Sequence, residues 1–395
     1  MRWLSQVWTV AEMGVRSIPQ RLAWTVSAAI GIALVVMVMV SILSIATGFR
    51  ATLEKTGSPA NAIVLRSGTD SELSSNLTLE DTKIVADAPG VARTPDGATV
   101  SAEVFVIVDL PQRATGTEAN VPLRGVQPAA FEIRQRIRIV EGRSFEPGRN
   151  ELIAGAAAAQ EFAGLEVGSV LDFGEADWTV VGRFEADGSL SESELWCDVN
   201  VLQPAYRREG QFQSVYVKLD SPGAFDEFKD TLTSDQRVSV RVVREDEYYA
   251  TQSEVLDTIV VSLGTIVTIL MGIGAVFGAV NTMYSAVASR TREIATMRAL
   301  GFGGSAVAIA VLIESLVIAL VGGLAGGVAA YFAFNGYRAA TLNWQSFSQV
   351  AFAFRVTPWL MFLGIVASLV MGVLGGVFPA VRAARTPVAA ALREL

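Results

Sequence analysis

Four long uncharged stretches are the feature that most constrains how this chain can fold. They lie between Arg21 and Arg50, between Asp257 and Arg290, from residue 307 to 337 with Glu314 as the only charge, and between Arg355 and Arg382. Each is longer than the roughly 20 apolar residues that cross a bilayer as a helix. A composition of 51% hydrophobic and 18% charged residues agrees with this interpretation. The stretches therefore predict an α-helical membrane protein with four transmembrane helices.

The first stretch has an alternative interpretation as a secretory signal peptide. Ser44, Ile45 and Ala46 resemble a small-residue cleavage site. The apolar run, however, exceeds the roughly 7–15 residues of a signal-peptide core, and the segment before it is longer than a signal peptide's N-region. We therefore expect an uncleaved membrane anchor. The preceding segment, residues 3–15, has an amphipathic pattern and predicts a helix along the inner membrane surface, or else a continuation of the first span interrupted near Pro19.

Basic residues are distributed unevenly around the four stretches. With a cytoplasmic N-terminus, the inner segments carry nine arginines against three glutamates, whereas residues 48–254 carry 20 basic and 34 acidic residues. Because basic segments stay on the cytoplasmic side, both termini are expected in the cytoplasm and residues 48–254 in the periplasm. The acidity of this external segment also argues against nucleic acid as a partner.

The external segment alternates strand and helix signals. Strands are expected at 61–66, 98–110, 119–127, 151–155, 169–173, 178–186, 193–202, 212–219 and 237–243, and helices at 78–88, 128–136, 155–162 and 222–233. The first helix has Thr78 as a cap, with Asp81 three residues later. Strands separated by single helices predict an α+β domain, with two subdomains.

Catalytic and metal-binding chemistry finds little support in the sequence. There is no histidine and a single cysteine, Cys197, which argues against Ser-His-Asp catalysis and against a cysteine-based metal centre. Cys197 is expected to be a packed residue. The acidic run 185–194 could be a calcium loop, but it lacks the spaced Asp/Asn pattern, so a solvated loop is favoured. We expect no catalytic residue, metal site or cofactor site in this chain.

The sequence SRTREIATMRALGFGG (289–304) is a short charged segment between the second and third apolar stretches. Val287, Ile294, Met297 and Gly301 recur at helical spacing, and the final glycines suit a helix C-terminus. The pattern predicts a short amphipathic helix on the cytoplasmic side. By periodicity alone, it could also be a surface helix whose arginines only fix the membrane topology.

The stretch REIATMRALGFGGSAVAIAVLIESLVIALVGGLAGG (292–327) resembles the C-terminal signature of the MacB/FtsX/LolC-type permeases of ABC transporters. The shared pattern is an Arg-Glu-Ile helix, an Ala-Leu-Gly turn, and a span with an early glutamate followed by paired glycines. Residues 138–202 are similar to the periplasmic core domain of the same family. The resemblance implies four transmembrane helices and a MacB-like periplasmic core domain between the first two.

The resemblance also implies that 289–304 is a coupling helix seated in a groove of a cytoplasmic ATPase. The residues expected to contact the ATPase are Arg290, Arg292, Glu293, Ile294, Met297, Arg298, Leu300 and Gly301. A phosphate-binding loop needs Gly-x4-Gly-Lys-Ser/Thr, and the one lysine before a threonine, Lys55, has Glu54 where that glycine should stand. The ATPase, with its ATP and Mg²⁺, is therefore expected as a separate subunit in two copies, beside a second permease copy in a homodimer.

Glu314 lies inside the third apolar stretch, where an unpaired carboxylate is costly. We expect it to anchor the inner end of the helix bundle, with a role in a proton relay as the alternative. Four pairs of glycines spaced by four residues predict close helix packing. They are Gly322/Gly326, Gly323/Gly327, Gly274/Gly278 and Gly372/Gly376.

These expectations divide the chain into nine segments. They are a cytoplasmic or interfacial amphipathic helix (1–21), transmembrane helix 1 (22–49), the periplasmic α+β domain (50–250), a stalk with transmembrane helix 2 (251–285), the coupling helix (286–305), transmembrane helix 3 (306–335), an external loop (336–357), transmembrane helix 4 (358–381) and a cytoplasmic tail (382–395).

The resemblance implies a mechanical transmitter in the bacterial inner membrane, with residues 245–257 as a stalk. Three functions are compatible with it. The first is export of a small amphipathic molecule or lipid, with a periplasmic adaptor and an outer-membrane channel as partners. The second is release of lipoproteins, and the third is FtsX-like regulation of a periplasmic hydrolase. The large external domain argues against the third, and the first two stay open.

Overall fold

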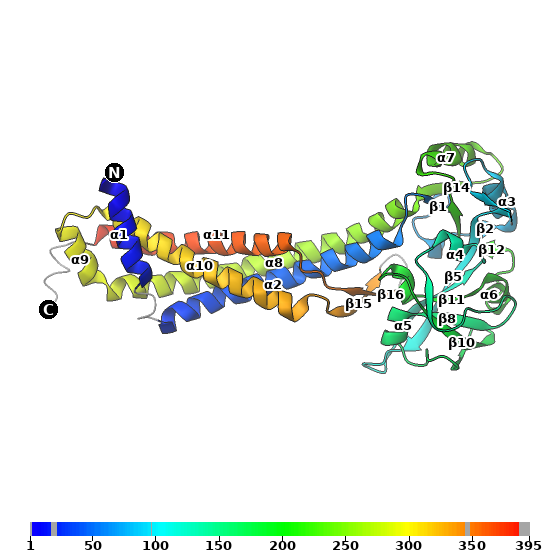
Figure 1. Ribbon diagram of the computed structural model, residues 1–395, viewed down its shortest axis with the longest axis horizontal. Coiled ribbons are helices and arrows are strands. Elements are labelled where there is room, and N and C mark those ends of the chain that lie inside the picture. The colour runs from blue at the N-terminus through cyan, green and yellow to red at the C-terminus, as the bar shows by residue number, and fades with distance from the viewer. Residues whose placement is uncertain (1, 17–21, 96, 344–347, 387–395) are drawn as a thin grey trace. The chain divides into compact units, whose positions relative to one another are not determined.

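The computed structural model describes residues 2–16, 22–95, 97–343 and 348–386. The chain divides into two compact units, drawn together in Figure 1. The helical unit takes residues 1–47, 259–337 and 354–395, and the sheet unit takes 48–258 and 338–353. Pro19 and residues 387–395 of the expected cytoplasmic tail lie outside the described residues.

Within the described residues, six helices contribute to the helical unit. They are α1 Arg2–Arg16, α2 Leu22–Thr56, α8 Glu245–Ser289, α9 Thr291–Ala299, α10 Gly304–Phe334 and α11 Pro358–Arg385. Helices α2, α8, α10 and α11 are each long and apolar enough to cross a membrane, which confirms the four expected spans. Helix α8 has 45 residues, about twice what a bilayer needs. Its residues up to Thr258, and those of α2 from Gly48, belong to the sheet unit.

Glycines let α10 pack closely against two neighbouring helices. A Cβ added to Gly322 or Gly326 would lie 2.7 or 2.3 Å from the carbonyl oxygen of Ala29 or Ala33 in α2. These distances are well inside van der Waals contact, so a larger residue would push α2 and α10 apart. Close backbone approach of this kind is how helices associate in membranes.

The other paired glycines differ in how closely they approach a neighbouring helix. Gly323, Gly372 and Gly376 lie where α10 and α11 meet, and a Cβ on any of them would come within 2.9 Å of the opposing helix. Gly327 makes only an ordinary van der Waals contact. Gly274 and Gly278 of α8 have no neighbour within 4 Å among the described residues, so a packing role for this pair stays a prediction.

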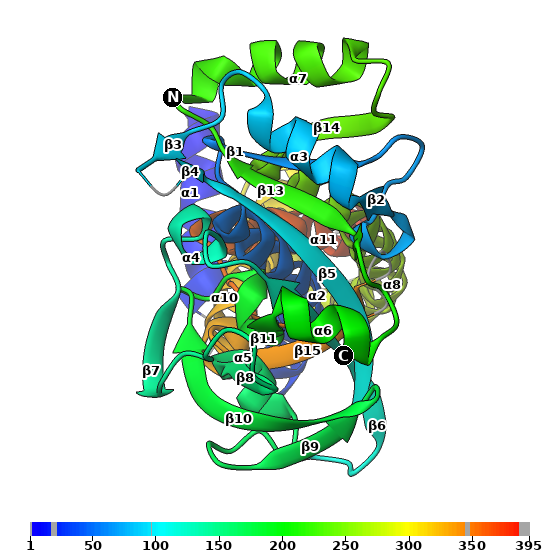
Figure 2. The same cartoon turned by 90° about the vertical axis from the view of Figure 1, so that its right-hand side faces the viewer.

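The sheet unit is organised around a ten-stranded sheet, in the order β14-β1-β13-β5-β6-β11-β8-β10-β7 with β9 beside β10 (Figure 2). Its strands are β1 Asn61–Arg66, β5 Val100–Pro111, β6 Glu118–Val126, β7 Arg138–Gly142, β8 Glu151–Gly155, β9 Val170–Phe173, β10 Ala176–Glu185, β11 Leu195–Asp198, β13 Ser214–Lys218 and β14 Val240–Arg244. The short strands β2 Leu77–Thr78 and β12 Gln211–Phe212 pair with each other, as do β3 Arg93–Thr94 and β4 Gly97–Ala98.

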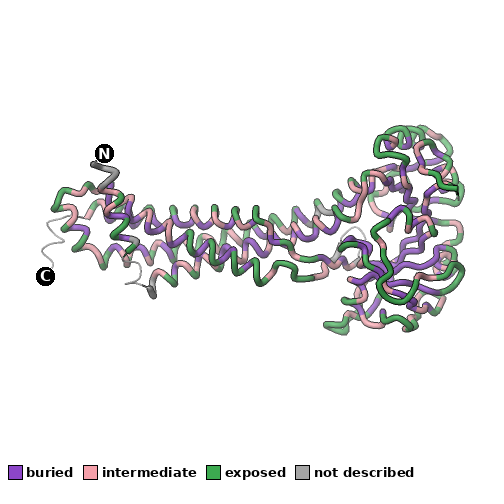
Figure 3. Tube along the Cα trace, viewed as in Figure 1, coloured by how far each residue is buried: buried purple, intermediate pink, exposed green. Residues whose placement is uncertain are grey.

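Short helices complete the sheet unit. They are α3 Leu79–Asp87, α4 Ala130–Ile133, α5 Ala156–Glu161, α6 Val199–Ala205 and α7 Phe225–Ser234, with the 3-10 turns η2 Glu72–Ser74, η3 Leu190–Ser193 and η4 Pro222–Ala224. In α3, Thr78 and Asp81 form the expected capping box. Figure 3 shows buried residues concentrated along the strands.

One continuous sheet runs through the region for which two subdomains are expected, because strand β5 pairs with a different strand at each end. Residues 100–103 of this strand pair with β13, and residues 104–111 pair with β6. One hydrophobic cluster follows the sheet through both halves, from Val64 and Val85 to Leu165 and Trp178. A twelve-residue strand that pairs with different partners at its two ends joins what the sequence pattern would divide.

Two further predictions for this unit are wrong. The strand expected at 193–202 ends at Asp198, because the Asp198 carboxylate accepts a hydrogen bond from the amide of Asn200 at 3.0 Å and caps α6. The run 185–194 is not simply a solvated loop, since Leu190, Ser191 and Glu194 are buried. Among the described residues, no group of acidic side chains there could hold a metal ion.

The expected external loop contains a β-hairpin that belongs to the sheet unit. Strands β15 Arg338–Asn343 and β16 Ser348–Ala353 pair antiparallel. The amide of Ala351 donates to Ser193 Oγ at 3.0 Å, and the Gln112 amide donates to Gln349 Oε1 at 2.8 Å. The connection between α10 and α11 is therefore attached to the sheet unit.

The expected membrane orientation can be tested with single cysteines, because the native Cys197 is fully buried and burial raises the pKa of its thiol well above the ordinary value. A membrane-impermeant maleimide should label Ser234→Cys in intact spheroplasts. It should label Ala299→Cys only after permeabilisation. Both positions are exposed. Labelling of Ala299→Cys in intact spheroplasts would reverse the expected orientation.

Candidate coupling and transmission sites

Helix α9 is a separate short helix between α8 and α10. Arg290 interrupts the helical path with a backbone φ of −108° and ψ of 9°. The helix ends at Ala299, and Gly301, two residues later, has a φ of +99°, in the left-handed region that favours glycine. The glycine therefore fixes where α9 stops and where the chain turns into α10.

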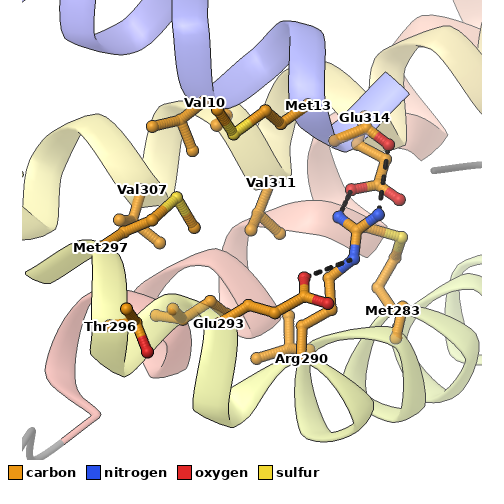
Figure 4. A pocket seen from close by; sticks show the side chains of 15 residues that line it. Val10, Met13, Met283, Arg290, Glu293, Thr296, Met297, Val307, Val311 and Glu314 are labelled. Carbon is orange, nitrogen blue, oxygen red and sulfur yellow. Dashed lines mark hydrogen bonds and ion pairs between the residues drawn. The ribbon is translucent and has the colours of Figure 1, made fainter. Parts of the chain in front are cut away.

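The inner face of α9 packs on the helical unit. Ile294 and Ala295 are buried. Met297 is half-buried and contacts apolar residues of two clusters, one with Val307 and one with Val10 of α1. A pocket of about 340 Å³ opens beside it, between α1, α8, α9 and α10 (Figure 4). Met297 was expected to contact the ATPase, but its side chain is engaged within the protein.

Arg290 connects three helices at one end of this pocket (Figure 4). Its guanidinium donates to Glu314 Oε2 in α10 at 3.2 Å and to the backbone oxygen of Gly14 in α1 at 3.3 Å. The carboxylate of Glu293 lies 3.9 Å away. Arg290 is 13% exposed and Glu314 is 7% exposed. Arg290 therefore pairs the carboxylate of Glu314, which would be costly to bury alone.

The outer face of α9 carries the side chains that remain available to a partner. Arg292, Glu293, Thr296, Ala299 and Leu300 are exposed, and their spacing places them along one side of the helix. Leu300 is 75% exposed. We call these five residues the α9 outer face.

The sequence pattern anticipated only part of the α9 outer face. Thr296 and Ala299 were not expected there. Arg298 was expected, but it is half-buried and donates to the backbone oxygen of Thr386 after α11. Gly301 is exposed beside the outer face. The spacing alone could not separate a face turned toward a partner from one packed on α1 and α10.

A second site is a buried ionic network in the sheet unit. Arg124 of β6 donates to Glu72 Oε1 at 2.7 Å, to Glu103 Oε2 at 3.0 Å and to Glu194 Oε1 at 2.8 Å. Arg134 donates to Glu103 Oε1 at 2.7 Å. All five side chains are less than 9% exposed. We call them the buried ionic network.

Each charge in this network is stabilised by its partners. Burial alone would raise the pKa of Glu72, but Arg124 and Ser214 hold it below the ordinary value. Burial would lower the pKa of Arg124, but Glu194 and Glu72 hold it well above the ordinary value. Glu72 and the guanidinium groups of Arg124 and Arg134 therefore stay charged at neutral pH.

The first turns of α8 are attached to this network. The amide of Glu72 donates to Tyr248 Oη at 3.2 Å, and the hydroxyls of Tyr249 and Tyr216 lie 3.0 Å apart. Glu245 Oε2 accepts from Asn61 Nδ2 at 2.8 Å. Glu245, Tyr248 and Tyr249 are buried. The start of α8 is thus fixed to the sheet by polar contacts as well as by packing.

The end of α2 lies directly against the start of α8. A Cβ on Gly57 would lie 2.4 Å from the Cα of Asp246, so only glycine fits. Arg50 of α2 pairs with Asp257 of α8. Phe49 and Leu53 of α2 are buried. The two helices therefore enter the sheet unit as one packed pair.

The sequence contains a signal for the buried ionic network. Glu103 and Arg124 interrupt the apolar strands VSAEVFVIVDLP and EANVPLRGV, where a charge on a buried face is costly unless paired. Their partners lie far apart in the chain: Glu72 is in η2, and Glu194 directly follows η3. Only the fold brings the four together.

Two protein families match this chain, one in its N-terminal part and one in its C-terminal part. Residues 25–235 match the MacB-like periplasmic core domain family, and residues 265–388 match the FtsX-like permease C-terminal family. The macrolide export ATP-binding/permease protein MacB 1/2 of Paracoccus denitrificans (strain Pd 1222) is 25% identical over 331 residues, which cover 79% of this chain and 48% of that relative. The chain therefore spans about half the length of this curated relative.

Two solved structures are similar to part of the chain. The extracellular domain of the ABC-type transporter YknZ from Gram-positive bacteria is 16% identical, covering 47% of this chain and 100% of that one, with a TM-score of 0.35. The periplasmic region of MacB from Actinobacillus actinomycetemcomitans is 13% identical, covering 50% and 94%, with a TM-score of 0.37. Because the first family match alone covers more than half of the chain, this protein belongs to the MacB/FtsX-type permeases of ABC transporters, with a MacB-like periplasmic domain.

Proposed function

We propose that this permease transmits ATP-driven motion of a separate ATPase to its periplasmic domain. The observation that carries this proposal is that α2 and α8 are continuous helices shared by both units, and that the start of α8 is held by the buried ionic network. A displacement of either helix must then act on the sheet. The β15–β16 hairpin adds a third connection between the units.

The α9 outer face is the proposed contact with the ATPase. It presents an exposed leucine beside charged groups, a combination typical of protein interfaces with an apolar anchor and a polar rim. Binding of ATP and Mg²⁺ is assigned to the ATPase. The phosphate-binding sequence Gly-x4-Gly-Lys-Ser/Thr that this binding needs does not occur in the sequence given. Two ATPase copies and a second permease copy complete the proposed assembly in the inner membrane, with both termini cytoplasmic.

Of the three possible functions, we favour export of a small amphipathic molecule or lipid, with a periplasmic adaptor and an outer-membrane channel as partners. Its support is the curated relative, which is named as a macrolide exporter. Release of lipoproteins is the alternative, and FtsX-like regulation of a periplasmic hydrolase is a third. The pairing of Glu314 with Arg290 supports an anchoring role for this carboxylate rather than a proton relay.

Transmission can be tested with spin labels on the part of α8 inside the sheet unit. Thr251 is exposed, and the buried Cys197 would not react with the label. In a reconstituted complex of two permeases and two ATPases, the distance between labels at Thr251→Cys on the two permease copies should change between ADP and ATP with vanadate. An unchanged distance during normal ATP hydrolysis would contradict the proposal.

The purified chain by itself is expected to hydrolyse no ATP. The reason is the missing phosphate-binding loop in its sequence. The measurement is phosphate release before and after stringent removal of copurifying proteins, with the reconstituted complex as the positive control. Activity that follows the permease through that removal would show that it carries its own ATPase site.

A further inference from the structure

A polar pocket of about 260 Å³ lies in the sheet unit where α2 ends and α8 begins. Residues 55–58 line it from the end of α2, Asn61 from β1, residues 133–137 from the segment after α4, and Lys218 from β13. Glu245, the first residue of α8, completes the lining together with residues of the 186–191 segment. The pocket therefore touches both helices that connect the two units.

Most of the charged side chains that line the pocket are cationic. Lys55, Arg136 and Lys218 have no carboxylate within 4.0 Å among the described residues. Lys55 Nζ donates to the backbone oxygen of Asp187 at 3.2 Å, and Arg136 donates to the backbone oxygen of Lys55. These acceptors are uncharged, so the positive charges are not neutralised. Arg134, the fourth cation of the lining, is paired with Glu103.

Glu245 supplies a second, independent feature. The residue is 1% exposed. Its Oε2 accepts hydrogen bonds from the amide of Ser58 at 3.1 Å and from Asn61 Nδ2 at 2.8 Å. Its Oε1 is buried without a hydrogen-bond partner among the described residues. Because both donors act on Oε2, a proton on this carboxyl group would sit on Oε1, where it could be donated to an oxygen of a ligand.

We propose that this pocket binds the phosphate group of an anionic phospholipid. Three cations without carboxylate partners and a buried carboxyl oxygen surround a space that accommodates a phosphate with part of its glycerol. Lys55 follows Phe49, where the uncharged part of α2 ends, by six positions, or about 9 Å along the helix. That is close to the roughly 5–8 Å thickness of the headgroup region on each side of a bilayer. Free phosphate has the same binding chemistry and is the other source.

The test uses the full chain, purified and reconstituted in nanodiscs of phosphatidylcholine with phosphatidylglycerol or of phosphatidylcholine alone. The variants are Lys55→Gln, Lys218→Gln and the double substitution. Lys83→Gln, an exposed lysine of α3 outside the pocket, is the matched control. Native mass spectrometry after release into detergent measures retained phosphatidylglycerol. The unfolding temperature with and without inorganic phosphate measures binding of the free anion.

The unchanged chain and Lys83→Gln should retain phosphatidylglycerol in preference to phosphatidylcholine. Lys55→Gln and Lys218→Gln should each retain about tenfold less, because each loses one charge-assisted contact, and the double variant should retain still less. Glu245→Gln should bind at least as well, since it removes the negative charge and keeps a donor. A rise in unfolding temperature with inorganic phosphate that the double variant lacks would support the site with free phosphate as its ligand.

Two results would overturn the proposal. One is equal retention of phosphatidylglycerol by the double variant and the unchanged chain, with no difference in their response to inorganic phosphate. The other is weaker retention by Glu245→Gln than by Lys55→Gln. A thermal unfolding curve for each variant without ligand separates loss of binding from loss of folding. The binding site does not depend on the proposed transmission function, so the two can fail separately.

Discussion

Replacing Arg124 by alanine is expected to lower the free energy of unfolding of the sheet unit by about 3–5 kcal/mol, because it leaves buried carboxylates without their partner. Arg124 contacts Glu72, Glu103 and Glu194, and only Glu103 keeps a guanidinium, that of Arg134. A loss of this size is a large part of the roughly 5–15 kcal/mol that stabilises a typical domain. Fluorescence of Trp196, whose Nε1 donates to Glu194 Oε2 at 2.7 Å, reports the transition during chemical denaturation.

The control for this prediction is Arg138→Ala. Arg138 forms an exposed ion pair with Asp187, both more than half exposed, and such pairs contribute about 1 kcal/mol or less. A loss for Arg124→Ala no larger than that for Arg138→Ala would contradict the structural importance of the buried ionic network.

The pH dependence of unfolding gives a second measurement of the same network. The pKa of Glu72 is lower in the folded protein than its ordinary value of 4.5. Its contribution is therefore fully present above pH 4.5 and is lost as the pH falls through the folded-state pKa. The unchanged chain should lose this stability in acid, whereas Arg124→Ala, which lacks the cause of the shift, should show a smaller loss over the same range.

Replacing Leu300 by aspartate is expected to reduce copurification of the ATPase by about tenfold or more, because truncating a buried apolar anchor costs about 2 kcal/mol or more. Leu300 is 75% exposed at the end of α9, so the substitution should not disturb folding. Ser289→Asp, which adds the same charge at an exposed position before α9, is the control. Normal ATPase binding by Leu300→Asp would favour the alternative in which α9 only fixes the topology.

Met297→Asp should impair the permease for a different reason, which is loss of stability. The sequence pattern predicts that Met297 is the apolar contact with the ATPase, but the side chain packs against the apolar residues between α9, α10 and α1. A charge there should lower the unfolding temperature of the permease itself.

Glu293→Lys should weaken ATPase binding more than Glu293→Ala, because reversal adds repulsion, and Glu293 is exposed.

The four membrane helices could be derived from the sequence, because crossing a bilayer requires long uncharged runs that few other structures contain. Most strands of the sheet unit could be derived as well, since alternation of apolar residues reflects burial of one face. The turn at Gly301, just after α9, could also be derived, because glycine favours the positive φ found there. These features depend on residues that are close together in the chain.

The joining of distant segments was decided by the tertiary structure. Periodicity placed Arg290 and Met297 on a helix, but only packing against α1 and α10 turned them inward and left Leu300 outside. The double pairing of β5 made one sheet of two expected subdomains, and Asp198 ended a strand that apolar residues would have continued. The partners of Arg124 lie 21 to 70 residues from it in sequence. A local pattern reports which face of an element is apolar, whereas the choice of what covers that face depends on contacts that form only when the whole chain folds.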